Sequence, residues 1–151
     1  MGSEMCIRDR DDDRVVVVAS VEGRGALNAA VLLGASMPLY ASASGKAILS
    51  LMPDETGRAL LPRQLKRFTD HTVVDRKTLY QQVARVRDDR LAHAESELAL
   101  GLHSLAVPVP AGVWGAQPCA LGCAGPTPGK SDERWELART LLLDLASGFK
   151  L

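Results

Sequence analysis

The first regular pattern along the chain is a run of β-branched residues. RVVVVASV (14–21) is apolar at nearly every position, with charged residues before it and EGRG after it. Such a run predicts a buried strand over Val15–Val21 that ends in a turn. The apolar segment Ala26–Leu33 follows a short glycine-containing connection, and we expect it to pair with this strand as an antiparallel hairpin.

Helical spacing replaces this pattern after residue 40. A helix is expected to begin near Ser42 or Ser44, either of which can cap it, and to stop at Pro53. A short second helix is expected to begin with the acidic PDE (53–55) and to end near LLPR (60–63). The apolar face of the first helix consists of Ala47, Ile48, Leu51 and Met52.

Two longer amphipathic helices follow. DRKTLYQQVARVRDDRLA predicts a helix capped by Asp75 or Thr78, and SDERWELARTLLLDLASGF predicts a last helix capped by Ser131. Asp132 and Glu133 then lie at the positive end of the last helix dipole. The expected buried stripes are Leu79, Val83 and Val86 in the former helix, and Trp135, Ala138, Leu142, Leu145 and Phe149 in the latter.

Three segments between these helices are typical of strands. LAHAESE (91–97), LHSLAVPV (102–109) and QPCALGCAG (117–125) are separated by glycine and proline turns. The order of strands, helices, strands and a last helix predicts an α+β fold with a mostly antiparallel sheet. It lacks the βαβ alternation of a doubly wound nucleotide-binding fold.

Length and composition are those of one globular domain. The chain has 151 residues, 46% of them hydrophobic, and its 18 Lys+Arg balance 18 Asp+Glu. A net charge of zero gives no overall field to attract DNA, so the isolated chain is not expected to bind nucleic acid. No apolar run reaches the 18 or more residues of a membrane span, no secretory signal opens the chain, and the few cysteines favour a reducing, cytoplasmic setting.

The first residues form a separate case. MGSEMCIRDR is similar to a translated adapter or cloning scar, and the charged DDDR follows it. We therefore expect residues 1–13 to be a disordered leader outside the fold, and the domain to occupy residues 14–151.

The Ser44-Gly45-Lys46 sequence raises the possibility of a phosphate-binding loop. That motif needs a glycine where Tyr40 stands and a hydroxyl where Ala47 stands, so a nucleotide site is not expected. Nucleophilic catalysis has no motif either, because neither S-x-x-K nor G-x-S-x-G occurs.

Metal-ligand spacing is also absent from the sequence. His71, His93 and His103 lack H-x-H or H-x-x-x-H spacing, and each is more typical of a surface or core residue than of a ligand. Cys119 and Cys123 fall on one face of a strand, where buried small apolar residues are the simpler interpretation. No metal and no cofactor are expected.

Two features remain as candidate chemistry. Glu95 and Glu97 would share one face of a strand, as an acid-base pair, as a cation site or, more simply, as a solvated edge. The small residues from Ser42 to Gly45 begin a helix whose free amides could receive an anion, although tight backbone packing explains such residues equally well.

At this point the chain resembles a known family. MPLYASASGKAILSLMPDE, LKRFTDHTVVDRKTLYQQVARVRDD, ESELALGLHSLAVPV and CALGCAGPT are similar, in order and separation, to the effector-binding domain of IclR-family transcriptional regulators. The third block is closest to the branch that controls aromatic-acid catabolism through the beta-ketoadipate pathway. The similarity extends from about Val15 to the last helix.

The resemblance implies a GAF-like (profilin-like) fold, a curved antiparallel sheet flanked by helices, that binds a small organic acid. It implies a homodimer or tetramer and a regulator rather than an enzyme, with DNA bound only by an N-terminal winged helix-turn-helix that this chain lacks. The amides near Ser44 and Gly45 would receive the carboxylate. The ligand-binding positions that it implies are Ala29, Met37, Ala43, Ser44, Gly45, Leu102, Ser104, Gly122 and Ala124.

This sequence departs from the family at three polar positions. Relatives that bind small keto acids often carry an acid at the position of Ala94 and hydroxyls at those of Gly122 and Ala124. Their loss predicts a roomier, less polar pocket that suits an aromatic or longer acid. Two alternatives stay open: an oligomerisation module with a degenerate pocket, and a small-acid hydrolase or isomerase that uses Glu95, Glu97 or a histidine.

Overall fold

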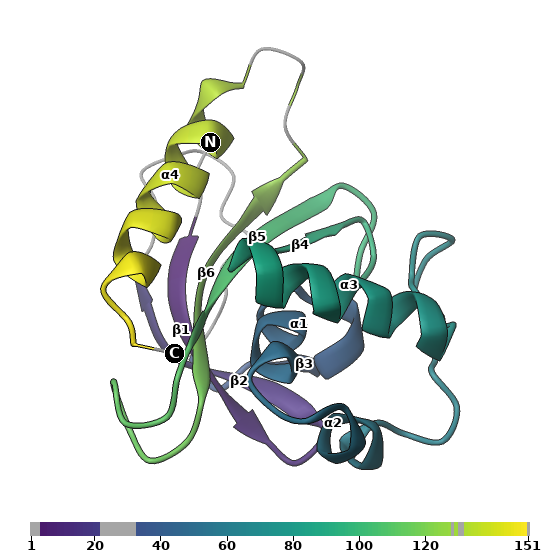
Figure 1. Ribbon diagram of the computed structural model, residues 1–151. Coiled ribbons are helices and arrows are strands. Elements are labelled where there is room, and N and C mark those ends of the chain that lie inside the picture. The colour runs from purple at the N-terminus through teal and green to yellow at the C-terminus, as the bar shows by residue number, and fades with distance from the viewer. Residues whose placement is uncertain (1–3, 22–32, 128, 130–131, 151) are drawn as a thin grey trace.

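The structure is a computed structural model that describes residues 4–21, 33–127, 129 and 132–150 (Figure 1). Its centre is a six-stranded sheet in the order β3-β2-β1-β6-β5-β4, in which every neighbouring pair is antiparallel. The strands are β1 (Glu4–Asp11), β2 (Arg14–Val21), β3 (Ser36–Pro38), β4 (Ala92–Glu95), β5 (Leu102–Val109) and β6 (Cys119–Pro126).

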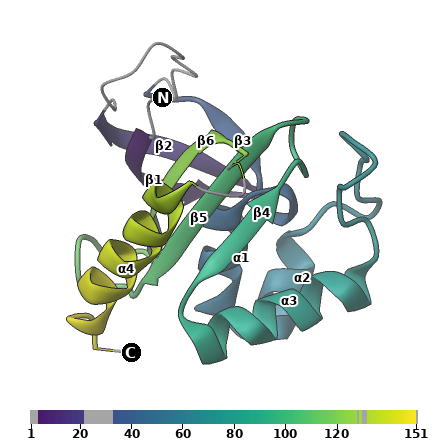
Figure 2. The same cartoon turned by 90° about the horizontal axis from the view of Figure 1, so that it is seen from above.

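Helices cover both faces of this sheet (Figure 2). On one face lies α1 (Ala43–Ser50), preceded by a 3₁₀ turn at Leu39–Ala41, with α2 (Asp54–Leu60) and α3 (Arg76–Asp89) outside it. On the other face α4 (Glu133–Ser147) packs against β5 and β6. The predicted α+β class, an antiparallel sheet flanked by helices, is therefore confirmed.

Two hydrophobic cores follow from this layering. Because side chains alternate along a strand, β5 supplies Ala106 to the core under α1 and Val107 to the core under α4. Cys119 and Cys123 share one face of β6, as their spacing predicts, and both are buried in the core under α4. Among the described residues no helix combines the length and apolarity that crossing a bilayer requires.

Helix starts mostly follow the predicted caps. The Ser42 side chain accepts from the Gly45 amide at α1, and the Asp75 carboxylate accepts from the Thr78 amide at α3. At α4 the cap is Asp132, whose carboxylate accepts from the Arg134 amide, and not the predicted Ser131.

The buried stripe of α4 differs from the prediction at one position. Trp135 and Leu142 are buried as expected, but Leu145 is 48% exposed and the small Ala146 next to it is buried. Because a helix has 3.6 residues per turn, Leu145 and Ala146 both lie near the buried stripe. The position that packs closely against the sheet is occupied by the smaller side chain, Ala146.

The prediction that residues 1–13 stay outside the fold is wrong for Glu4–Asp11. These residues form β1, which lies between β2 and β6 and pairs with both. Met5, for example, is opposite Val21 on one side and Cys123 on the other. The expected hairpin partner Ala26–Leu33 falls almost wholly outside the described residues; within them, β2 pairs with β1 and with β3.

Candidate functional site

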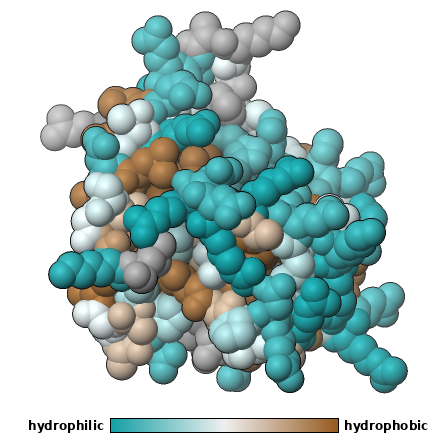
Figure 3. Space-filling view, viewed as in Figure 1, coloured by the Kyte–Doolittle hydropathy of each residue, from teal (hydrophilic) through white to brown (hydrophobic). Residues whose placement is uncertain are grey.

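A small cavity lies where the start of α1 faces the sheet. Its volume is about 60 Å³, and three polar residues, Ser42, Glu97 and Ser104, line it among apolar ones. The side of α2 and α3 presents a largely hydrophilic surface, whereas apolar atoms gather toward α4 (Figure 3). The full lining consists of Met37, Ala41, Ser42, Ala94, Glu97, Leu98, Leu102, Ser104 and Ala124.

Four of the nine ligand-binding positions implied by the resemblance line this cavity. They are Met37, Leu102, Ser104 and Ala124. They come together because β3, β5 and β6 present alternate residues to the α1 face, and Ser104 is directly opposite Ala124 in the β5–β6 register. Ala29 lies outside the described residues.

Ala43, Ser44, Gly45 and Gly122 are buried behind the cavity wall rather than in its lining. A Cβ atom on Gly45 would lie 2.0 Å from the Leu39 carbonyl oxygen, and one on Gly122 would lie 2.7 Å from the Leu105 carbonyl oxygen. Both glycines therefore permit close packing of α1 against its surroundings. For Gly45 this agrees with the alternative given above, that the small residues from Ser42 to Gly45 serve tight backbone packing.

The amides at the start of α1 do not match the expectation at Gly45. The Gly45 N–H donates to the Ser42 Oγ at 3.1 Å, while the Ser42 hydroxyl donates to the Pro38 carbonyl at 3.3 Å. The Gly45 amide is thus occupied by the helix cap and is not available to a ligand carboxylate in this conformation.

Lys46 forms a buried ion pair with Glu97 and takes no part in a phosphate loop. Its Nζ donates to both carboxylate oxygens of Glu97, at 2.7 and 2.5 Å, and Lys46 is only 1% exposed. Burial lowers the pKa of Lys46 from its ordinary 10.5, and the charge and hydrogen bond of Glu97 oppose this shift. The pair places a carboxylate in the cavity wall while keeping the wall electrically neutral.

The segment that carries Glu97 is anchored to a neighbouring loop. The Thr72 hydroxyl donates to the Glu97 carbonyl at 2.6 Å and accepts from the amides of Phe68 and Thr69. The Thr69 hydroxyl donates to the Ser96 carbonyl at 2.5 Å. These bonds hold the backbone of Ser96 and Glu97 in place, while Lys46 holds the Glu97 carboxylate.

Glu95 and Glu97 do not share a strand face. β4 ends at Glu95, and Ser96 adopts a left-handed conformation with φ of 54°. Glu95 is exposed on the strand, whereas Glu97 turns inward to Lys46. The expected pairing of the two acids is therefore wrong, because the strand is shorter than the sequence pattern indicates, and the solvated edge holds for Glu95 alone.

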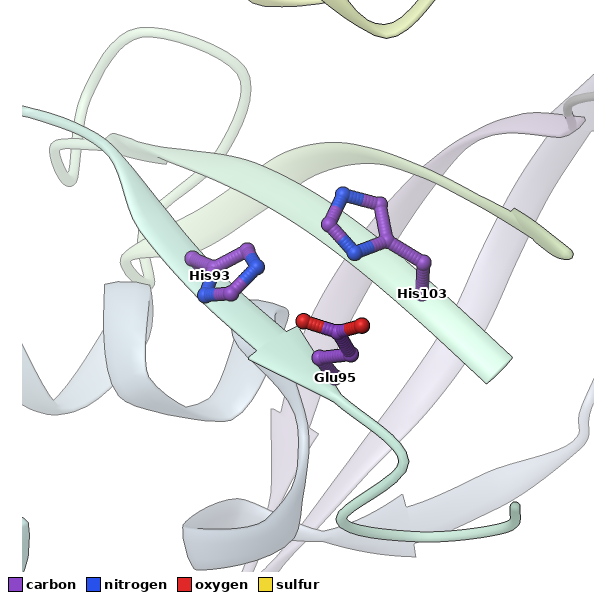
Figure 4. Close-up of side chains that lie close together, drawn as sticks. All are labelled: His93, Glu95 and His103. Carbon is purple, nitrogen blue, oxygen red and sulfur yellow. The ribbon is translucent and has the colours of Figure 1, made fainter. Parts of the chain in front are cut away.

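His93 and His103 lie beside each other and beside Glu95 (Figure 4). The two ring centroids are 4.8 Å apart. His71 is exposed and lies outside this cluster. Burial lowers the pKa of His103 below its ordinary 6.5, His93 lowers it further, and Glu95 opposes both. Sequence spacing could not reveal this cluster, because its members come from neighbouring strands.

Five lining residues were absent from the implied site: Ala41, Ser42, Ala94, Glu97 and Leu98. Ser42 and Ala94 were within reach of sequence reasoning, because the capping serine precedes the implied helix positions and Ala94 matches a polar position of relatives. Glu97 was not, since its inward turn depends on Ser96.

Comparison with known proteins places this architecture among transcriptional regulators. The chain is 37% identical over 92 residues to the HTH-type transcriptional regulator Rv1719 of Mycobacterium tuberculosis (61% of this chain, 36% of that protein). It is 26% identical over 155 residues to the HTH-type transcriptional repressor AllR of Escherichia coli K12 (99% of this chain, 57% of that protein). The chain thus spans little more than half of AllR and about a third of Rv1719.

The family follows from a match over nearly the whole chain. The family described as bacterial transcriptional regulator IclR C-terminal matches residues 2–146, so the chain belongs to this family. The match includes the residues of β1, in agreement with their place in the sheet. The relatives are named as regulators and repressors rather than enzymes, as the resemblance implied.

A solved structure of a ligand complex shares the fold. It is the inducer-binding domain of a double mutant of the transcription factor PobR from Acinetobacter, in complex with 3-hydroxybenzoic acid. The TM-score is 0.75 at 27% identity, over 95% of this chain and 87% of that one.

Proposed function

We propose that this domain binds a small organic acid in the cavity beside Ser42 and Ser104, and that binding alters operator affinity in a longer cytoplasmic regulator. The observation that carries the proposal is a partly open, mostly apolar cavity with two serines in its lining, at the α1 start. Small-molecule sites combine an apolar lining with a few placed polar groups in this way.

The cavity volume bears on the size of the acid. About 60 Å³ is several-fold below the roughly 300–1,000 Å³ of typical ligand pockets. The hollow itself holds a compact acid of a few heavy atoms, whereas an aromatic acid would have to extend through its open side or displace Met37, Leu98 or Leu102. The roomier pocket expected from the lost polar positions is not what the described residues form, and so an aromatic effector remains the second choice.

Charge recognition must come from neutral groups. Lys46 is already paired with Glu97 and the Ser42 hydroxyl already donates to the Pro38 carbonyl, so the carboxylate of the ligand would be met by the hydroxyl of Ser104. The resemblance to a regulator domain crystallised with 3-hydroxybenzoic acid supports the acid class, without fixing its size.

Calorimetric titration with a panel of short aliphatic and aromatic acids tests the proposal. We expect a short acid to bind, and Ser104→Ala to weaken it about tenfold, because one hydrogen bond in a dry site is worth on the order of 1.4 kcal/mol. Ala124→Leu should abolish binding by filling the cavity. Ser50→Ala is the matched control, because Ser50 is buried in α1 but lies outside this cavity.

Flat titrations with every acid at about millimolar concentration would count against an effector site. They would favour the alternative of an oligomerisation module with a degenerate pocket, for which the small cavity is the supporting observation. Light scattering would then still report the homodimer or tetramer that we propose for either function.

A further inference from the structure

His93, Glu95 and His103 form a side-chain cluster on the sheet face opposite the cavity. Alternation along the strands explains the separation, since Ala94 and Ser104 line the cavity while their sequence neighbours face α4. In the β4–β5 register Glu95 is directly opposite His103. Neighbouring strands thus bring two imidazoles and a carboxylate to one place.

The geometry of these three side chains is that of a metal site. Each offers one ligand atom, and the three atoms lie within 4.8 Å of one another. The side chains are directed toward a common space between β4 and β5 (Figure 4). We propose that His93, Glu95 and His103 bind a divalent transition-metal ion of the zinc class, at a site separate from the effector cavity.

An unsatisfied ring nitrogen supports the proposal independently. His103 is only 6% exposed, and its Nδ1 is buried without a hydrogen-bond partner among the described residues. In Figure 4 the ring nitrogen next to the Cβ-bearing carbon faces the Glu95 carboxylate. Burying a polar atom unpaired is costly, and a metal ion in the common space would accept its lone pair.

The donor set selects the kind of metal. Two histidines and one glutamate with an open fourth position are a known zinc arrangement, and imidazole donors disfavour calcium and magnesium. Tetrahedral zinc with bonds of about 2.1 Å needs ligand atoms roughly 3.4 Å apart. The cluster must therefore contract by somewhat over 1 Å, which rotation of the exposed His93 and Glu95 side chains can supply.

The surroundings admit a cation. A groove of about 430 Å³ between the sheet and α4 opens onto both histidines, and Asp89, Glu136 and Arg139 line it. Asp89 and Glu136 outweigh Arg139, so the charge of the groove lining is negative. The carboxylate of Glu95 in the cluster adds a further negative charge. The Trp135 ring meets the His103 ring edge-on at 4.1 Å between centroids and holds it in place.

Zinc titration of tag-free protein tests the site. After removal of metal with EDTA, calorimetry should show about one zinc ion per chain with Kd below about 50 µM, and zinc should raise Tm. Because His93 and Glu95 are exposed, His93→Ala and Glu95→Gln should fold normally and bind zinc at least about tenfold more weakly. Cobalt bound to the wild type should give the absorption spectrum of a four- or five-coordinate ion.

His71→Ala is the matched control, because it removes an exposed histidine outside the cluster and should leave zinc binding unchanged. Wild-type Kd above about 50 µM would overturn the proposal, as would tight binding that survives both His93→Ala and Glu95→Gln. The second result would assign the zinc to other donors, such as the thiols of Cys119 and Cys123.

Discussion

Lys46 illustrates how one residue can take a role that its sequence context does not suggest. The Ser44-Gly45-Lys46 sequence is similar to part of a nucleotide loop, yet the ammonium is buried against Glu97, which is 51 residues away. Removing both charges from water is costly, and only their mutual attraction and hydrogen bonds offset that cost. The effect of the pair on stability should therefore be largest when one partner is removed and the other charge stays buried alone.

Lys46→Met should destabilise the domain by about 3–5 kcal/mol, because it leaves the Glu97 carboxylate buried without a counter-charge. Lys46→Met combined with Glu97→Leu should recover much of this loss, since no buried charge then remains. Urea unfolding of both variants measures the two effects. Lys77→Met, at an exposed position of α3, should change stability by less than about 0.5 kcal/mol. Equal destabilisation by the single and double variants would contradict this account.

At the scale of elements, hydrophobic periodicity and capping residues predicted most of the helices and strands. Asp75 and Ser42 cap α3 and α1 because their side chains accept from amides three residues ahead, whereas the sequence also allowed Thr78 and Ser44. Leu145 and Ala146 show the limit: both suit the stripe of α4, and only the packing against the sheet decides which is buried. The early end of β4 at Glu95 likewise depends on the Ser96 backbone, which polarity does not encode.

The cap of α3 gives a pH-dependent prediction. Hydrogen bonds from the side chain and backbone of Thr78 hold the pKa of Asp75 below its ordinary 3.8. A carboxyl with a lowered folded-state pKa adds stability above its unfolded pKa, and this stability is lost as the pH falls through the folded pKa. Asp75→Asn keeps a neutral acceptor, so its Tm should lie below wild type at about pH 7 and approach it at about pH 3. Thermal unfolding monitored by circular dichroism measures both. A Tm difference that stays constant with pH would show that the charge of Asp75 is not involved.

At the scale of the whole molecule, the sites depend on pairing between distant strands. Ser104 and Ala124 meet in the cavity, and His93 and His103 meet on the other face, through register between β4, β5 and β6. A single sequence does not contain that register. The family resemblance therefore predicted four of the cavity residues, and no sequence pattern predicted the histidine cluster. The order of the sheet was equally hidden, because the charged residues before Val15 gave no strand signal.

The central position of β1 is the least expected feature of the fold, and one backbone substitution tests it. Cys6 lies between Ser20 of β2 and Gly122 of β6 in the two registers. Proline at this position cannot donate a backbone hydrogen bond, and its ring does not fit the interior of a sheet. Cys6→Pro should therefore cost about 3 kcal/mol or more and lower Tm by roughly 6–12 °C for a domain of this size. Cys6→Ser is the control, because it keeps the backbone N–H, and calorimetric unfolding compares the two. If Cys6→Pro unfolds at the wild-type temperature, residues 4–11 do not pair on both sides in solution, and β2 and β6 must be joined in some other way.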